Sequence, residues 1–220
     1  IASSAVTEAK IADNAITLAK MAHGTDGEII TYDSSGAPAT VGVGSSGQVL
    51  TSNGAGSAPT MQDSAGGLYA SIAIIADQKS SGTNGGTFTS GAWRTRDLNT
   101  EISDADGIVS ISSNQFTLQT GTYTISWSAP GWRVDRHKSK LRDITGSTDI
   151  QIGSSEYVLS SSGDGTISRG TAVVTITSAN TYEIQHYCGV TGSIGLGLAG
   201  GSSTGSVVEI YTTVEILKHS

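Results

Sequence analysis

The sequence predicts an all-β protein, in which an antiparallel β-sandwich head of the jelly-roll type follows a repetitive shaft. Short stripes of alternating apolar residues, separated by Gly, Ser and Asn turns, fill residues 68–220. Glycine is abundant (29 residues) and proline is rare (3 residues), which favours turns and strands over helices. Residues 1–67 are short repeats, too small to enclose a core of their own. We therefore expect three parts, over residues 1–22, 23–67 and 68–220.

The first part, residues 1–22, contains a ten-residue repeat that reads IASSAVTEAK IADNAITLAK. Its apolar residues recur every five positions, a spacing that fits neither a helix nor a strand. One solution alternates extended steps with helical turns at Thr7–Lys10 and Thr17–Lys20; a second is a tightly wound helix with a narrow alanine stripe; a third is a flexible Ala/Ser linker. Either of the first two needs neighbouring copies to bury its apolar residues, so we interpret the repeat as a piece of fibre shaft.

The second part, residues 23–67, repeats with an offset of twenty. The segment Gly27–Asp33 (GEIITYD) lines up with Gly47–Asn53 (GQVLTSN), and the segments that follow at Gly36 and Gly56 match as well. Each copy predicts a short strand, a turn of Gly, Asp or Asn, and an extended return. An isolated hairpin is marginally stable in water, so these two also call for neighbouring chains.

The third part, residues 68–220, carries the stripes that predict the sandwich. They alternate with a period of two, as strands with one buried face do. The stripes are Phe116, Leu118, Tyr123, Ile125 and Trp127 around a turn at Gly121; Ala172, Val174 and Ile176; Tyr182, Ile184, His186 and Cys188; and Val208, Ile210, Thr212, Val214 and Ile216. Leu68–Ala76 is apolar on both faces, which predicts a strand covered on both sides, with another subunit as one candidate cover.

Composition and charge exclude several classes of protein. The net charge of −7 argues against nucleic acid as a partner, because phosphate binding needs a basic surface. The longest purely apolar run, Ile72–Ala76, is far too short to span a membrane. Cys188 is the only cysteine, so an intrachain disulfide is impossible. The chain begins at Ile1 rather than Met, and we expect it to be the C-terminal part of a longer protein.

Motif matches to enzymes and metal proteins lack the context that they need. The GxGxxG match at Gly195–Gly200 and the GxSxG match at Gly201–Gly205 run into a strand, whereas a dinucleotide site or a nucleophile elbow opens a helix. Ser103–Gly107 resembles the start of a calcium loop without the later ligands, so a turn is favoured. Among four scattered histidines, His186 is expected to be a core residue and Cys188 a buried thiol. We therefore predict no catalytic residue, no cofactor and no metal ligand, and a protein that is not an enzyme.

The most pronounced charged segment runs from Trp132 to Arg142 (WRVDRHKSKLR). On a strand, its side chains at Arg136, Lys138, Lys140 and Arg142 would project from one face. The functional interpretation is a patch for an anionic surface such as an acidic polysaccharide. The alternative, which we favour, is a solvated edge strand whose lysines discourage pairing with other sheets.

The repeats, together with the paired segments GEIITYDSSGAPATV and GQVLTSNGAGSAPTM, resemble segments of tail-fibre and related receptor-binding proteins of bacteriophages. The third part resembles the C-terminal tip domain of the same proteins, most specifically over FTLQTGTYTISWSAPGWRVDRHKSKLRDITGSTDIQIGSSEY, TYEIQHYC and VEIYTTVEI. That tip is similar to the trimeric jelly rolls of the complement and tumour-necrosis-factor family. The resemblance implies a homotrimeric, extracellular virion fibre that joins other tail or fibre proteins and contacts a host-cell receptor through its distal head.

The resemblance carries over no receptor residue by motif, so candidate receptor-binding residues come from chemistry alone. Exposed aromatic and arginine side chains dominate binding hot spots. On this basis the candidates are Trp93, Arg94, Arg96, Trp132 and Tyr157, together with Arg136, Lys138 and Lys140 of the charged segment. Two rival functions stay open: a purely structural virion fibre or decoration protein, and a tailspike enzyme that cleaves polysaccharide with a pair of carboxylates.

Overall fold

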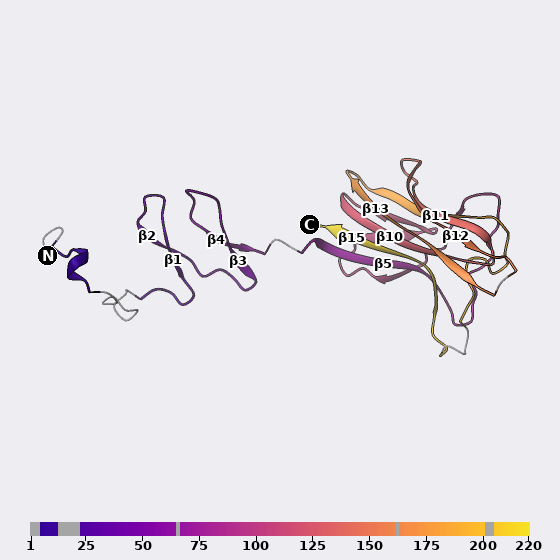
Figure 1. Ribbon diagram of the computed structural model, residues 1–220, viewed down its shortest axis with the longest axis horizontal. Helices are drawn as coiled ribbons and strands as arrows, with labels where there is room; N and C mark the ends of the chain where they lie inside the picture. The colour runs from indigo at the N-terminus through magenta and orange to yellow at the C-terminus, as the bar shows by residue number, and fades with distance from the viewer. Residues whose placement is uncertain (1–4, 13–22, 65–66, 162, 201–204) are drawn as a thin grey trace. The chain divides into compact units, whose positions relative to one another are not determined.

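The computed structural model describes residues 5–12, 23–64, 67–161, 163–200 and 205–220 (Figure 1). The chain divides into two compact units, residues 1–65 and residues 66–220. Within the described ranges, no helix has the length and apolar character needed to cross a membrane.

The ten-residue repeats are described over residues 5–12. There a short 3₁₀ helix, η1 (Glu8–Lys10), forms where the first helical turn is predicted, and the Lys10 amide donates to the Thr7 carbonyl at 2.9 Å. The second predicted turn, Thr17–Lys20, lies outside the described residues.

Two hairpins form where the twenty-residue repeat predicts them. Strand β1 (Ile29–Tyr32) pairs with β2 (Pro38–Val41), and β3 (Gln48–Thr51) pairs with β4 (Thr60–Asp63). The loops repeat as well as the strands, because Gly36 and Gly56 occupy matching positions and both have a φ of 79°. That left-handed conformation is accessible to glycine at little cost, which explains why both copies keep it.

The hairpins do not bury their own apolar side chains. Ile30 is 59% exposed and Tyr32 is 66% exposed, while Val49 and Leu50 of the second hairpin are each about half exposed. Val41 is the one apolar residue of the described part of this unit that is buried. This unit therefore lacks a core within one chain. Burial of apolar surface is the main source of stability, so a single chain gains little from folding these hairpins.

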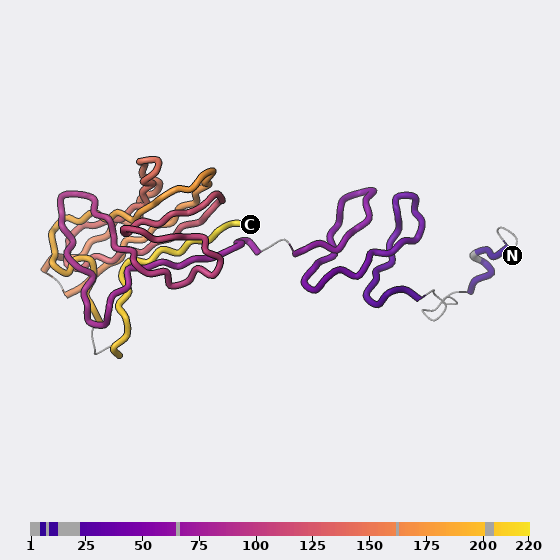
Figure 2. Tube along the Cα trace, turned by 180° about the vertical axis from the view of Figure 1, so that it is seen from behind, coloured from indigo at the N-terminus to yellow at the C-terminus, as the bar shows by residue number. Residues whose placement is uncertain are grey.

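The head, residues 66–220, is a sandwich of two antiparallel sheets (Figures 1 and 2). The five-stranded sheet has the order β13 (Gly165–Ile176), β10 (Gly121–Trp132), β15 (Glu209–His219), β5 (Tyr69–Lys79), β7 (Thr100–Ser103). The six-stranded sheet has the order β12 (Thr148–Val158), β11 (Asp135–Asp143), β14 (Asn180–Cys188), β9 (Gln115–Leu118), β8 (Val109–Ser112), and β6 (Arg94–Thr95) also pairs with β14. The predicted all-β, jelly-roll class of the head is confirmed.

The predicted stripes supply most of the core between the sheets. The first stripe is split between the sheets, because the turn at Gly121 separates β9 from β10 and these two strands lie in opposite sheets. The stripes on β13 and β14 are buried as predicted. The last stripe is wrong at its start: Val208 and Ile210 are exposed, because a bulge between Ile210 and Thr213 shifts the alternation.

The strand predicted to be apolar on both faces is β5. Its residues Ala73 and Ile75 are fully buried in the core. On the opposite face Ile72 is 44% exposed and Ile74 is half-buried. Within one chain, the predicted cover is therefore present on one face only.

One tryptophan links the two sheets at the centre of the sandwich. The indole Nε1 of Trp127 on β10 donates to the Ser139 hydroxyl on β11 at 2.8 Å. The ring lies over Gly170, its neighbour on β13, and a Cβ atom at this position would stand 2.1 Å from the Trp127 ring. A glycine at position 170 is thus required by the ring rather than by the backbone conformation.

We predict that Gly170→Ala lowers the free energy of unfolding of the head by about 1–3 kcal/mol, because the added methyl group must displace a packed ring. Urea unfolding followed by tryptophan fluorescence measures the change. Gly163→Ala is the matched control, since its Cβ would meet no atom closer than 3.9 Å. Equal stability of the two variants would contradict the packing argument.

Candidate functional site

The head carries a groove on the outer face of the six-stranded sheet. It has a volume of about 580 Å³. Its lining comes from β11, β12 and the end of β14: Arg136, His137, Lys138, Ser155, Glu156, Tyr157, Tyr187 and Gly189. We call it the β11 groove.

Strand register brings the side chains of the β11 groove together. Arg136 stands opposite Tyr157 of β12, and Lys138 stands opposite Tyr187 of β14. Directly opposed residues project from the same face of a sheet, so these four side chains share the outer face. Tyr157 is 55% exposed, and the Arg136 guanidinium lies 6.0 Å from the centre of its ring. The groove therefore offers two cations and two tyrosine rings to solvent.

A tryptophan outside the sheet supports one side of the groove. Trp93, just before β6, meets Tyr187 edge to face with ring centres 5.8 Å apart. The Lys140 ammonium lies 4.2 Å from the centre of the Trp93 ring, and it also binds Asp149 at 2.8 Å. Trp93 is thereby held between a cation and a tyrosine, which restricts the orientation of Tyr187.

The four basic residues predicted to share one face differ in their pairing. Lys140 and Arg142 both bind Asp149, and these bonds lower the pKa of that carboxyl. Arg136 and Lys138, by contrast, have no carboxylate within ion-pair distance among the residues that the structure describes. The charge available to a ligand is therefore concentrated at these two positions.

Several predicted candidates meet at the β11 groove. Arg136, Lys138 and Tyr157 line it, and Trp93 supports it. Lys140 is buried, so its predicted role as a contact residue is wrong: it packs beneath Trp93 instead. The solvated edge strand is also wrong, because β11 lies between β12 and β14.

Two further candidates lie outside the groove lining. Arg94 is exposed, and its Nε donates to the Thr89 carbonyl at 3.2 Å. Trp132 is half-buried, with the Arg133 guanidinium 5.7 Å from its ring centre. Neither residue lines the β11 groove.

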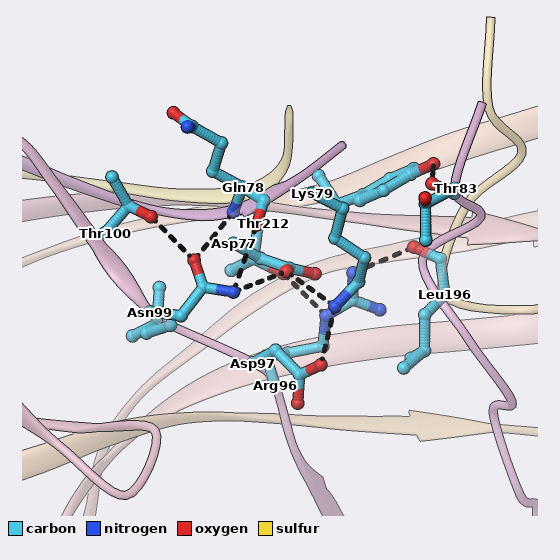
Figure 3. Close-up of polar contacts among 12 residues, drawn as sticks. Asp77, Gln78, Lys79, Thr83, Arg96, Asp97, Asn99, Thr100, Leu196 and Thr212 are labelled. Carbon is cyan, nitrogen blue, oxygen red and sulfur yellow. Dashed lines mark hydrogen bonds and ion pairs between the residues drawn. The ribbon is translucent and has the colours of Figure 1, made fainter. Parts of the chain in front are cut away.

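The prediction for Arg96 is wrong, because its side chain is completely buried. Figure 3 shows its surroundings. Its guanidinium donates to the Thr212 hydroxyl at 2.6 Å and to the carbonyls of Pro130 and Leu196 at 3.1 and 2.9 Å. Arg96 thus ties the segment after β6 to β15, to β10 and to the loop before β15, a structural role that its sequence position does not indicate.

Acidic neighbours balance this buried cation. Lys79 binds Asp77 at 2.9 Å and Asp97 at 3.0 Å (Figure 3). Burial lowers the pKa of Arg96 to about 10, while both aspartates oppose that shift. Burial also raises the pKa of Asp77, although its bond to Lys79 acts in the other direction. The cluster holds the loop connections of the head in place.

A pair of buried histidines was not found by sequence reasoning. His137 Nδ1 and His186 Nε2 lie 2.9 Å apart, and His137 Nε2 bonds to the Thr166 hydroxyl at 2.7 Å. Burial lowers the pKa of His137 to about 4 and lowers the pKa of His186 as well. Both rings are therefore neutral at pH 7. His186 is a core residue as predicted.

The remaining motif interpretations can be compared with the structure. Ser193–Leu196 forms turns where the dinucleotide motif would need a helix, and most of Gly201–Gly205 lies outside the described residues. Asp104 uses its carboxylate to accept the amides of Ile108 and Val109, as a turn residue does. Cys188 is buried as predicted, and burial raises its pKa to about 11.

The outer face of the other, five-stranded sheet is less charged. Ile72, Leu217, Thr124 and Val173 stand side by side across β5, β15, β10 and β13, and we call this the apolar row. Val173 is 63% exposed. Hydroxyl pairs bridge neighbouring strands on the same face: Thr122 with Thr175, Ser126 with Thr171, and Ser128 with Thr213.

The head is similar in fold to several solved domains. The globular domain of zebrafish complement 1qA protein has 12% identity and a TM-score of 0.42, over 66% of this chain and 94% of that one. Murine APRIL has 5% identity and a TM-score of 0.43, over 67% and 98%. Eiger TNF from S. frugiperda has 10% identity and a TM-score of 0.43, over 68% and 92%. No family model matches the chain, and no curated protein matches it.

We predict that Arg96→Met lowers the free energy of unfolding by about 3–5 kcal/mol, because three buried acceptors lose their donor and two aspartates lose a cation. Arg96→Lys should also destabilise the head, since an ammonium cannot span the same three acceptors. Urea unfolding measures both. The neighbouring exposed Arg94→Met is the control, with an expected change within about 0.5 kcal/mol. A near-neutral Arg96→Lys would contradict the bridging role.

We predict that the head loses stability as the pH falls from about 6.5 towards 4. The unfolded chain binds protons on its histidines below its ordinary pKa of 6.5, whereas folded His137 resists protonation until about pH 4. The contribution of neutral His137 to the free energy of unfolding is therefore complete above pH 6.5. It falls between pH 6.5 and about 4, where the unfolded chain binds a proton and the folded chain does not. Imidazole proton chemical shifts from NMR test the cause directly: a His137 midpoint near 6.5 in the folded protein would exclude it.

Proposed function

We propose that this protein is a homotrimeric attachment fibre of a virion, in which the C-terminal head binds a host-cell surface receptor without catalysing a reaction. The observation that carries the proposal is the β11 groove, where Arg136, Lys138 and two tyrosine rings face solvent. Unpaired cations and exposed aromatic rings are the side chains that dominate binding hot spots. The sequence resemblance to bacteriophage tail-fibre tips supports the virion location and the extracellular setting.

Trimer formation is supported by apolar surface that one chain leaves uncovered. The hairpins at residues 29–63 have exposed apolar side chains and no core, and β5 is covered on one face only. The apolar row offers a contact surface for a second head. Its neighbouring hydroxyl groups already bond to each other, so burying them costs less than burying charges.

The β11 groove would stay open in such an assembly. It lies on the outer face of the six-stranded sheet, whereas the apolar row lies on the outer face of the five-stranded sheet. These are opposite faces of one sandwich. Three copies of the groove would then face the surroundings, and binding through several of them at once raises the overall affinity.

The rival functions make different demands on the same head. A purely structural fibre needs no receptor contact, and it leaves the two unpaired cations of the groove without a role. A polysaccharide-cleaving tailspike needs two carboxylates beside the substrate. Among the described residues that line the β11 groove, Glu156 is the one carboxylate, so the groove does not supply the pair. Release of oligosaccharide from host polysaccharide would favour the enzyme.

We predict that Val173→Glu converts the trimer to a monomer, because it places a charge at the most exposed end of the apolar row. Size-exclusion chromatography with light scattering measures the mass of each species. Ile152→Glu is the matched control: Ile152 is 44% exposed, and it stands opposite Lys140 on the other outer face. A wild-type monomer would overturn the trimer, and an effect of both variants would remove the apolar row as its cause.

We predict that the purified chain adsorbs to host cells and competes with the virus for its attachment sites. Several weak heads on each virion act together, so competition should need a large molar excess of soluble trimer. Binding of labelled protein to cells and the rate of virus adsorption measure the two effects. Failure in both assays would leave the structural fibre as the better account.

A further inference from the structure

We propose that the β11 groove binds an acidic polysaccharide, with its acid groups on Arg136 and Lys138 and its sugar rings against Tyr157 and Tyr187. The inference rests on the proposed attachment function and gives the chemistry of the receptor. It is carried by the pairing of charges on β11, by the placement of the tyrosine rings and by the support that holds them.

The charges select an acidic ligand with well-separated groups. Arg136 and Lys138 are two positions apart on one strand face, so their attachment points lie about 7 Å apart along β11. An arginine binds a carboxylate or sulfate with two parallel hydrogen bonds, and a lysine adds a mobile point charge. Lys140 and Arg142 continue the row, but both already bind the Asp149 carboxylate.

The aromatic rings of the groove provide apolar surface that can contact a sugar ring, whereas a small anion has no use for such surface. A sugar ring has an apolar face of C–H groups, and a tyrosine offers a flat apolar ring with a hydroxyl at its edge. Tyr157 and Tyr187 flank the two cations from the neighbouring strands β12 and β14. The contact between Trp93 and Tyr187 fixes one of the rings in advance, which reduces the entropy lost on binding.

Other macromolecules fit the groove less well. Nucleic-acid binding gains its affinity by neutralising many phosphates at once, whereas the groove offers two cations without a carboxylate partner among the described residues. A peptide that adds a strand needs a free sheet edge, and β11 has a paired strand on both sides. A hydroxyl-rich chain that carries an acid group at intervals matches the two cations and the two tyrosine rings of the groove.

The test measures binding of the 220-residue chain to four immobilised polymers by biolayer interferometry. Polygalacturonate and heparin are acidic polysaccharides, dextran is an uncharged one, and poly-L-glutamate is an acid without sugar rings. We expect binding to at least one acidic polysaccharide, and binding to dextran and poly-L-glutamate at least tenfold weaker. The affinity should fall as NaCl rises from 50 to 300 mM, because salt screens exposed charges.

Variants assign the binding to the groove. Arg136→Gln with Lys138→Gln should weaken binding to the acidic polysaccharide at least tenfold, and Tyr157→Ala at least fivefold. Arg142→Gln removes the same charge from the same strand at a position that is already paired with Asp149, and its affinity should stay within twofold of wild type. Thermal unfolding confirms that each variant is folded.

The inference is overturned if neither acidic polysaccharide binds, if poly-L-glutamate binds as tightly as they do, or if a DNA duplex immobilised in the same assay binds more tightly. It is also overturned if Arg142→Gln weakens binding as much as the double variant does. Adsorption to host cells separates this failure from that of the proposed function. If wild type and the double variant adsorb equally, the groove is not the receptor site, but the proposed attachment function stands. If wild type binds polysaccharide but does not adsorb to cells, the attachment function alone is overturned.

Discussion

The alternation of side chains across strand β11 is the constraint on which the head depends most. Its odd-numbered residues His137, Ser139 and Leu141 are buried between the sheets, and its even-numbered residues face outward. A shift of one residue in register would turn His137 and Ser139 towards solvent, break their bonds to His186 and Trp127, and bury a row of cations. The same period of two therefore builds the core and the β11 groove, and neither can change without the other.

The buried polar groups show how the loops are held over this sandwich. Arg96 reaches three separate segments with one planar group, and Trp127 connects the sheets through Ser139. Such groups are costly to bury, and the cost is offset only when each finds a partner. The loops around the sandwich are thereby tied to the strands by directional bonds rather than by apolar packing alone. We infer that these bonds help to keep Trp93, three residues before Arg96, and the tyrosine rings in place.

The sequence predicted the strands well and the pairing of charges poorly. Alternation identified the stripes on β10, β13 and β14, because a period of two follows from strand geometry alone. Because the even-numbered residues of β14 form the buried stripe, the odd-numbered Tyr187 must lie on the outer face, where it stands opposite Lys138. The sequence contained this information, although it was not used. It could not show that Asp149 neutralises Lys140, nor that Arg96 is buried, since both depend on segments distant in the sequence. Exposure of a charged residue is a property of the fold, and local pattern does not determine it.

The two outer faces of the sandwich differ in a way that separates assembly from recognition. On the five-stranded sheet, hydroxyls satisfy each other across the strands beside the apolar row, and Glu215, between Ile74 and Ser126, is an exposed charge on the same face. On the six-stranded sheet, two cations are left without carboxylate partners among the described residues, and burying them against another copy of the same chain would oppose like charges. A trimer that uses the first face keeps the second face free. Each groove then needs only modest affinity, because a fibre that presents three of them multiplies weak contacts into stable attachment.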